Sequence, residues 1–423
     1  MKLHLRETPD YTAALAHLTD RGDDDLDRVT PAVAEILHAV RTRGDAALAE
    51  YSLKYDGAIP APFEYGPAEM AAALAGLDPA LAEVLRFSAH RIRAYHEKQV
   101  DPGLRYTDED GVGLGWRVRP LARVGVYAPG GKARYPSSVL MSAIPAAVAG
   151  VGEVLLATPR PTAEILAAAA IAGVSRVFDM GGAQAIGALA YGTARVPRVD
   201  KIVGPGNIYV ACAKKLVFGR VAIDGIAGPS EILVVADEGA DPEVVAADLL
   251  SQAEHDEAAY PLLVATTAAV AERALAALRS QLAVLPRRAI AEASVTANGH
   301  AFVVGDLAEA ARVVTALASE HLALLVRDPE ALLAQVGAAG AAFLGDWTPE
   351  AAGDYLAGPS HVLPTGGAVR FSSPLGVYDF IVRTSVIRYD RASLTRHGQA
   401  IMDFARAEGL EAHARAVEFR LRE

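Results

Sequence analysis

The stretch RVGVYAPGGKARYPSSVLMSAIPAAVAGVGEVLLAT, residues 123–158, decides the fold. It begins with a short apolar run at residues 123–127 and passes through a turn rich in Gly and Pro. Helical spacing follows from Ser138, and a second apolar run closes the stretch at residues 153–158. Two short apolar runs joined by a helix are typical of a β–α–β unit, whose strands are parallel.

The same alternation of apolar runs and helical patterns continues on both sides of this unit. One series extends to residue 218, and another runs from residue 231 to residue 344. Two such series predict an α/β fold with two Rossmann-like lobes, whose parallel-rich sheets lie around a cleft. After Asp379 the pattern is largely helical, with amphipathic stretches at residues 392–407 and 411–420 that could pack on a partner subunit.

These patterns divide the chain into four expected parts. Residues 1–20 form a short N-terminal segment, and residues 123–230 form one α/β lobe. Residues 21–122 together with 231–378 form the other lobe, and residues 379–423 form a helical C-terminal tail.

Composition excludes several classes of protein. Of 423 residues, 52% are hydrophobic and 22% charged, which supplies a large core and argues against disorder. The net charge is −11 and no basic block is evident, so nucleic acid and anionic membranes are not expected as partners. No apolar stretch resembles a membrane span or a secretory signal, and we expect a cytoplasmic protein that acts on small metabolites.

The single cysteine, Cys212, excludes an internal disulfide and a thiolate-cluster metal site. It lies in an Ala-rich helical pattern, which favours an inert buried thiol.

The nucleotide-binding signals are incomplete. No Gly-x-Gly-x-x-Gly stands between a strand and a helix. Gly130-Gly131-Lys132 resembles part of a phosphate loop, but the spacing fails and Ala133 stands where a hydroxyl is required. The Gly-Pro turns at residues 204–207 and 228–231 adjoin predicted strand ends, where α/β sheets bind ligands, although such turns are also ordinary punctuation.

Two short segments could carry chemistry, and each also has an ordinary explanation. Gln252 and His255 are three residues apart on one helix face and can converge on a metal ion, but an exposed helix end has the same composition. Glu320 and His321 stand between a helix and an apolar strand and could form an acid–base pair. Adjacent side chains usually point apart, so a surface pair is the simpler interpretation.

Two further pairs lie in the last fifth of the chain. Asp354 and His361 flank a loop rich in Gly and Pro, where ligand-binding groups often collect. Glu408 and His413 stand on either side of Gly409 at a predicted helix start. Taken alone, a surface connection and a helix boundary are the simpler interpretations of these two pairs. Taken together, the four segments supply nitrogen and oxygen donors without thiolates, which suits a zinc site open to substrate.

In their order along the chain, these segments resemble the signature of the histidinol dehydrogenase family. The matching segments are residues 123–141, 181–186, 203–207, 227–231, 251–255, 319–321, 353–354, 360–364 and 408–413. The resemblance covers essentially the whole chain. Ala128 and Ser360 stand where many relatives have other residues, but neither change removes a ligand or a catalytic group.

The resemblance implies an oxidation of L-histidinol through L-histidinaldehyde to L-histidine, the last step of histidine biosynthesis, with NAD and one Zn²⁺ per subunit. It implies that Glu320 and His321 are the acid–base pair. The implied zinc ligands are Gln252, His255, Asp354 and His413, and the implied NAD contacts are Tyr127, Gln184 and Asn207. The implied substrate contacts are Ser230, Gln252, His255, His321, Asp354, His361, Glu408 and His413. The C-terminal segment of this family reaches the neighbouring subunit, which implies a homodimer with shared active sites.

Three other functions fit the residues themselves. A related zinc dehydrogenase could act on another diol or on a sulfonated alcohol. A zinc hydrolase could use the same His, Asp and Glu set. A non-catalytic binding module could be built on the same fold.

Overall fold

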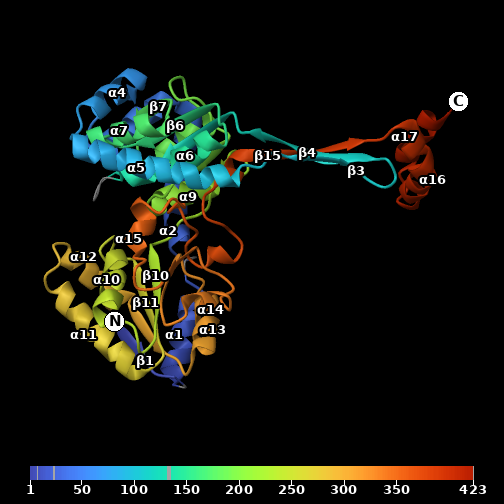
Figure 1. The fold of residues 1–423 in the computed structure, drawn as a ribbon. Helices are drawn as coiled ribbons and strands as arrows, with labels where there is room; N and C mark the ends of the chain where they lie inside the picture. Colours follow the sequence, from blue (N-terminus) through green and yellow to red (C-terminus); the bar gives the residue numbers. More distant parts are fainter. Residues whose placement is uncertain (7, 22–23, 131–134, 423) are drawn as a thin grey trace. The chain divides into compact units, whose positions relative to one another are not determined.

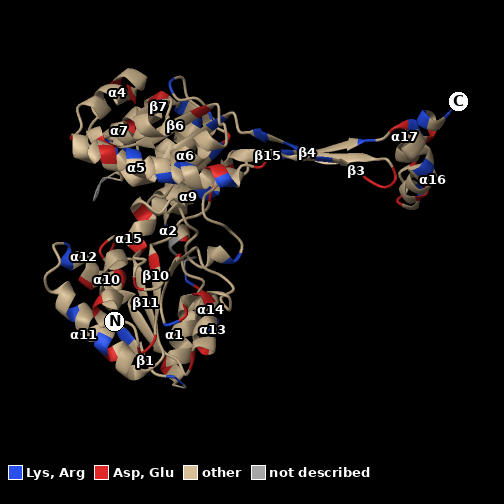
Figure 2. Ribbon diagram, viewed as in Figure 1, with Lys and Arg blue, Asp and Glu red and all other residues tan. Residues whose placement is uncertain are grey.

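The computed structural model describes residues 1–6, 8–21, 24–130 and 135–422, and the chain divides into two compact units (Figure 1). Unit 1 comprises residues 1–99 and 122–380, and unit 2 comprises residues 100–121 and 381–423. Within unit 1, charged residues lie mainly on the helices and loops that surround the sheets, and unit 2 carries further charged residues on its strands and helices (Figure 2).

The first sheet of unit 1 has six strands in the order β1-β12-β11-β10-β13-β14, and all its neighbouring strands are parallel. The strands are β1 (Lys2–His4), β10 (Glu231–Ala236), β11 (Tyr260–Ala265), β12 (His300–Val303), β13 (His321–Leu325) and β14 (Ala341–Leu344). Every residue of β10 is buried, because helices cover both faces of the sheet.

Alternate residues of β10 enter two separate cores. Ile232 and Val234 pack with α10 (Pro242–Ala253), α11 (Ala268–Leu282) and α12 (Arg288–Ala297) on one face. Leu233 and Val235 pack with α1 (Pro9–Thr19), α13 (Leu307–Leu317) and α14 (Pro329–Leu333) on the other face, and Figure 1 shows the two helical layers. This two-sided burial explains why the strand is a continuous apolar run rather than an alternating one.

The second sheet of unit 1 has the order β2-β7-β6-β5-β8-β9 and is parallel except for its edge strand β2. The strands are β2 (Glu64–Tyr65), β5 (Arg123–Tyr127), β6 (Glu153–Thr158), β7 (Arg176–Asp179), β8 (Lys201–Val203) and β9 (Ala222–Ile223). The helices are α2 (Asp24–Arg43), α3 (Asp45–Asp56), α4 (Pro67–Ala75), α5 (Pro79–His96), α6 (Pro136–Val148), α7 (Ala163–Ala172), α8 (Gly182–Tyr191) and α9 (Ile208–Val217). The expected α/β class with parallel-rich sheets is confirmed.

The structure divides the chain differently from the sequence prediction. Residues 24–96 were expected with residues 231–378, but their helices pack on the second sheet, α2 against α8 and α9, and α5 against α6. The reason is the apolar face of α2, where Val33 and Leu37 are buried in the core that surrounds β6 and β8. The first twenty residues are not a separate segment, because β1 is an edge strand of the first sheet and α1 covers that sheet.

Unit 2 contains a three-stranded antiparallel sheet and two helices. The strand order is β15-β4-β3, with β3 (Leu104–Thr107), β4 (Gly113–Pro120) and β15 (Ile381–Arg388). The helices α16 (Arg391–Ala407) and α17 (Glu411–Leu421) confirm the two predicted C-terminal helices. The strand β15 was not predicted, because most of its residues are only half-buried or exposed and so carry no apolar run.

The remaining short elements are α15 (Glu350–Tyr355) and the single-turn helices at Glu97–Gln99, Ala368–Arg370 and Val377–Phe380. Among the described residues, no helix is long and apolar enough to span a membrane.

Candidate active site

Glu320 lies between the end of α13 and the start of β13, and His321 is the first residue of β13. The helix ends at Leu317, and Ala318 turns the chain in a left-handed conformation with φ of 47°. Gly340 approaches this turn so closely that a Cβ atom there would lie 2.4 Å from the backbone oxygen of Glu320. Only glycine fits this contact without moving the chain.

Glu231, the first residue of β10, holds both side chains. Its backbone N–H donates to Oε2 of Glu320 over 2.9 Å, and its backbone oxygen accepts from Nδ1 of His321 over 2.8 Å. Glu320 Oε2 and His321 Nδ1 lie 3.5 Å apart. The two adjacent side chains therefore lie together, because the neighbouring strand supplies a partner for each.

These contacts define the protonation of His321. A backbone oxygen can only accept, so Nδ1 carries the hydrogen and Nε2 is the unprotonated nitrogen of a neutral ring. Burial lowers the pKa of His321, which favours that neutral form. Gln252 Nε2 also lies 3.2 Å from Nδ1, but both atoms carry hydrogen, so this contact is not a hydrogen bond. His321 can accept a proton at Nε2.

Glu320 is a buried carboxyl group with few compensating contacts. Burial raises its pKa well above the ordinary value for Glu, and the carboxylates of Glu231 and Glu350 act in the same direction. The N–H of Glu231 opposes this rise only in part. A carboxyl group perturbed in this way can exchange a proton closer to neutral pH than an exposed Glu.

Gln252 lies in the last turn of α10 and is buried. Its Nε2 donates to Oε1 of Glu350 over 3.1 Å, and Ser251 Oγ donates to Oε2 of the same carboxylate over 3.2 Å. Within the described part of the chain, Oε1 of Gln252 is buried without a hydrogen-bond partner. An unpaired buried amide oxygen is costly, and such an oxygen can act as a metal ligand.

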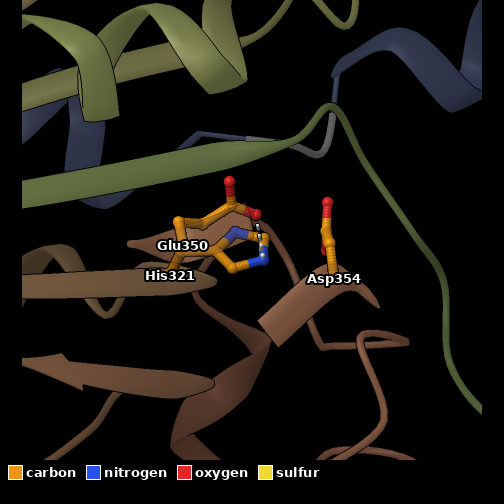
Figure 3. A group of neighbouring side chains, drawn as sticks. All are labelled: His321, Glu350 and Asp354. Atoms are coloured by element: carbon orange, nitrogen blue, oxygen red, sulfur yellow. Dashed lines mark ion pairs between the residues drawn. The ribbon is translucent and has the colours of Figure 1, made fainter. Parts of the chain in front are cut away.

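Three further donors gather near the Gln252 side chain, whose Nε2 lies 3.2 Å from His321 Nδ1 and 3.1 Å from Glu350 Oε1. His321, Glu350 and Asp354 each offer one donor atom, and these atoms lie within 4.8 Å of one another (Figure 3). Glu350 was not predicted from the sequence, although Glu350 and Asp354 are four residues apart and share one face of α15. Burial, followed by the charge of Asp354, raises the pKa of Glu350 to about 8.

His255 and His361 complete the cluster in unit 1. His361 Nδ1 lies 3.3 Å from Asp354 Oδ1. Burial acts to raise the pKa of Asp354, but the hydrogen bond to His361 and the neighbouring imidazoles outweigh it, and the net pKa is lowered. Burial lowers the pKa of His255, and the nearby Asp354 carboxylate opposes that shift. The structure thus brings together six of the expected residues, Gln252, His255, Glu320, His321, Asp354 and His361.

The expected site residues of unit 1 lie at the amino ends of the strands in the first sheet and at the carboxyl ends of the strands in the second sheet. Glu231 and His321 are the first residues of their strands, so the cluster lies at the amino ends of the first sheet. Ser138 on α6 of the second lobe reaches it, with Oγ 3.4 Å from Nε2 of His361. Ser230 immediately precedes β10, and its backbone oxygen accepts from the N–H of Tyr260.

The residues expected to contact NAD lie at the carboxyl ends of the second sheet. Tyr127 ends β5, is buried, and accepts a hydrogen bond from the N–H of Gly182. Gln184 is buried on α8, and Asn207 caps the N-terminus of α9 through its side-chain oxygen. Asn207 therefore has a structural role whatever else it contacts. The phosphate-loop fragment at Gly130-Gly131-Lys132 extends into residues 131–134, which lie outside the described residues.

The last two expected site residues belong to unit 2. Glu408 follows the final turn of α16, and His413 lies in the first turn of α17. Both are exposed on that unit.

Comparisons with known proteins agree over the full length of the chain. The family model described as histidinol dehydrogenase matches residues 19–421. The chain is 52% identical over 429 residues to the histidinol dehydrogenase of Syntrophotalea carbinolica, with 100% of both chains covered. It is 52% identical to that of Aquifex aeolicus, with 96% of each chain covered. The solved structure of histidinol dehydrogenase from Elizabethkingia anophelis superimposes with a TM-score of 0.94 at 33% identity, covering 100% of this chain and 98% of that one.

Proposed function

Because the chain belongs to the histidinol dehydrogenase family, we propose that it oxidises L-histidinol through L-histidinaldehyde to L-histidine, the last step of histidine biosynthesis. The observation that carries the proposal is the placement of the Glu320–His321 pair beside the donors of Gln252 and Asp354. Converting an alcohol to a carboxylate removes four electrons, so two hydrides leave the substrate carbon and two NAD are reduced.

The donor set fits Zn²⁺, which this family uses. The unpaired Gln252 Oε1 and the neighbouring His255 and Asp354 supply oxygen and nitrogen ligands, and His413 from a second copy of the chain would be the fourth. When bound, zinc acts as a Lewis acid and as a template for the substrate. Glu350 holds the Gln252 amide by its nitrogen, which leaves the amide oxygen free for the metal.

The proton transfers fall to two residues. His321 accepts the proton of the alcohol at Nε2 as the first hydride leaves, because its Nδ1 hydrogen is fixed on Glu231. Glu320 takes a proton from the water that adds to the aldehyde, and the resulting hydrate anion gives up the second hydride to leave the carboxyl group. Burial of both groups excludes bulk water and so protects the aldehyde from side reactions.

The remaining expected residues have binding roles in this proposal. Tyr127, Gln184 and Asn207 contact NAD, which accepts hydride when bound. Ser230, His361 and Glu408 contact the substrate, together with the zinc ligands and His321. By family resemblance, Glu408 and His413 of each C-terminal segment complete the partner's site, and the proposed working enzyme is a homodimer. The buried free thiol of Cys212 fits the cytoplasmic location that we propose.

One spectrophotometric assay tests the assignment. With L-histidinol and excess NAD, two NADH should form for each histidinol consumed, and a chelator should abolish the reaction until Zn²⁺ is restored. Equal or faster oxidation of a sulfonated diol would assign the site to a different dehydrogenase. Hydrolysis of a substrate without formation of NADH would assign the site to a hydrolase.

A further inference from the structure

Arg21 and Glu231 form a buried ion pair next to the proposed catalytic pair. The guanidinium donates from Nε to Oε1 and from Nη2 to Oε2 of Glu231, each over 2.7 Å. The two side chains are only 3% and 2% exposed. A further hydrogen bond orients Arg21 itself, because its Nη1 donates to the backbone oxygen of Leu18 over 2.5 Å. A bidentate pair of this kind fixes orientation as well as charge.

Glu231 connects the ion pair to both proposed catalytic residues through hydrogen bonds. Its backbone N–H holds the Glu320 carboxyl, and its backbone oxygen holds Nδ1 of His321. Its carboxylate Oε2 also accepts from the backbone N–H of Glu320 over 3.2 Å. The other carboxylate oxygen, Oε1, accepts from the N–H of Gly366 over 2.9 Å. The same carboxylate therefore also binds the loop that follows His361.

We propose that Arg21 and Glu231 are positioning residues for the oxidation of histidinol, and this inference rests on the proposed function. The ion pair fixes Glu231, and Glu231 sets the place of the Glu320 carboxyl and the tautomer of His321. Lysine could not replace Arg21, because a single ammonium group lacks the planar fork that engages both carboxylate oxygens. A displacement of about 1 Å at reacting groups can reduce the rate about 100-fold.

The energetics of buried ion pairs separate this role from a purely structural one. Taking two charges out of water costs about as much as their attraction returns, so replacing both partners by less polar residues is often neutral for stability. A pair that served only stability could therefore be replaced together without loss of turnover. A pair that positions Glu320 and His321 could not.

The test uses the zinc-loaded enzyme and two variants, Arg21→Lys and the double variant Arg21→Met with Glu231→Gln. We expect kcat to fall about 10- to 100-fold in both, with KM for NAD within twofold of the parent. The thermal midpoint of the double variant and its zinc content should match those of the parent. The matched control is Arg176→Lys, which breaks the bidentate pair with Glu64 at the edge of the second sheet and should leave kcat unchanged.

A rescue experiment distinguishes lost positioning from lost folding. In Arg21→Ala, added methylguanidinium should restore part of kcat, because it can occupy the vacated side-chain space and pair with Glu231. The inference is overturned if the folded, zinc-loaded double variant turns over at the parent rate. It is also overturned if activity falls only in proportion to zinc loss and methylguanidinium restores none. Failure of the parent enzyme to reduce NAD with L-histidinol would instead overturn the proposed function.

Discussion

Replacing Glu320 by Gln should separate the two hydride transfers. The amide has the size of the carboxyl and keeps an oxygen that can accept the N–H of Glu231, now 2.9 Å away. The variant loses the base proposed to activate water, and acid–base catalysis contributes about 10²- to 10⁴-fold, or about 3 to 5 kcal/mol. Formation of the aldehyde should change little, because His321 keeps its own contact with Glu231.

The same substitution should not destabilise the fold. Burial raises the pKa of Glu320, so the folded state disfavours the ionised form. Below the ordinary pKa of Glu, both folded and unfolded states are protonated and no penalty exists. As the pH rises from there towards the raised pKa, the unfolded state ionises first and stability falls. Gln has no such penalty, so the variant should match or exceed the parent's thermal midpoint at pH 7, and the difference should vanish near pH 4.

Stopped-flow absorbance of NADH measures the separation. The parent should release two NADH per site, whereas Glu320→Gln should give one fast NADH and a second about 1,000-fold more slowly. Supplied L-histidinaldehyde should be oxidised slowly by the variant. The comparison variant His321→Asn should instead slow the first transfer. Equal slowing of both transfers in Glu320→Gln, or no slowing, would refute the assigned role.

Three further outcomes test the site and its surroundings. Burial raises the pKa of Asp248 from 3.8 to about 6. Asp248→Asn should therefore raise the free energy of unfolding, measured with urea, by about 2 kcal/mol at pH 7 after allowance for solvent screening. Near pH 3, below both pKa values, the difference should be close to zero. Gly340→Ala should lower kcat at least about tenfold in steady-state assays, because the new Cβ would strike the Glu320 backbone, whereas Gly76→Ala, with ordinary contacts, should not. Glu350→Ala removes the acceptor of the Gln252 amide nitrogen and should weaken zinc binding about 10- to 100-fold in chelator competition. Unchanged affinity would contradict its role in orienting Gln252.

Local sequence patterns predicted most of the regular structure in the two lobes. The strands at residues 123–127, 153–158 and 201–203 are found within these bounds, because apolar runs flanked by turns mark strands buried on both faces. Amphipathic periodicity likewise located α16 and α17. The same logic missed β15, whose residues are half-buried or exposed, and it could not say which sheet the N-terminal helices cover.

By itself, the sequence determined the fold class, the family and the chemical types available at the site, because these depend on residue identity and local spacing. Only the tertiary structure decided that Glu320 and His321 lie together, since the residue that holds both, Glu231, is 89 and 90 positions away along the chain. It also decided that Glu350 joins the donors and that Arg21 fastens Glu231. Those contacts arise from the order of parallel strands in the first sheet and from the packing of chain segments around them, and neither is encoded in any local pattern.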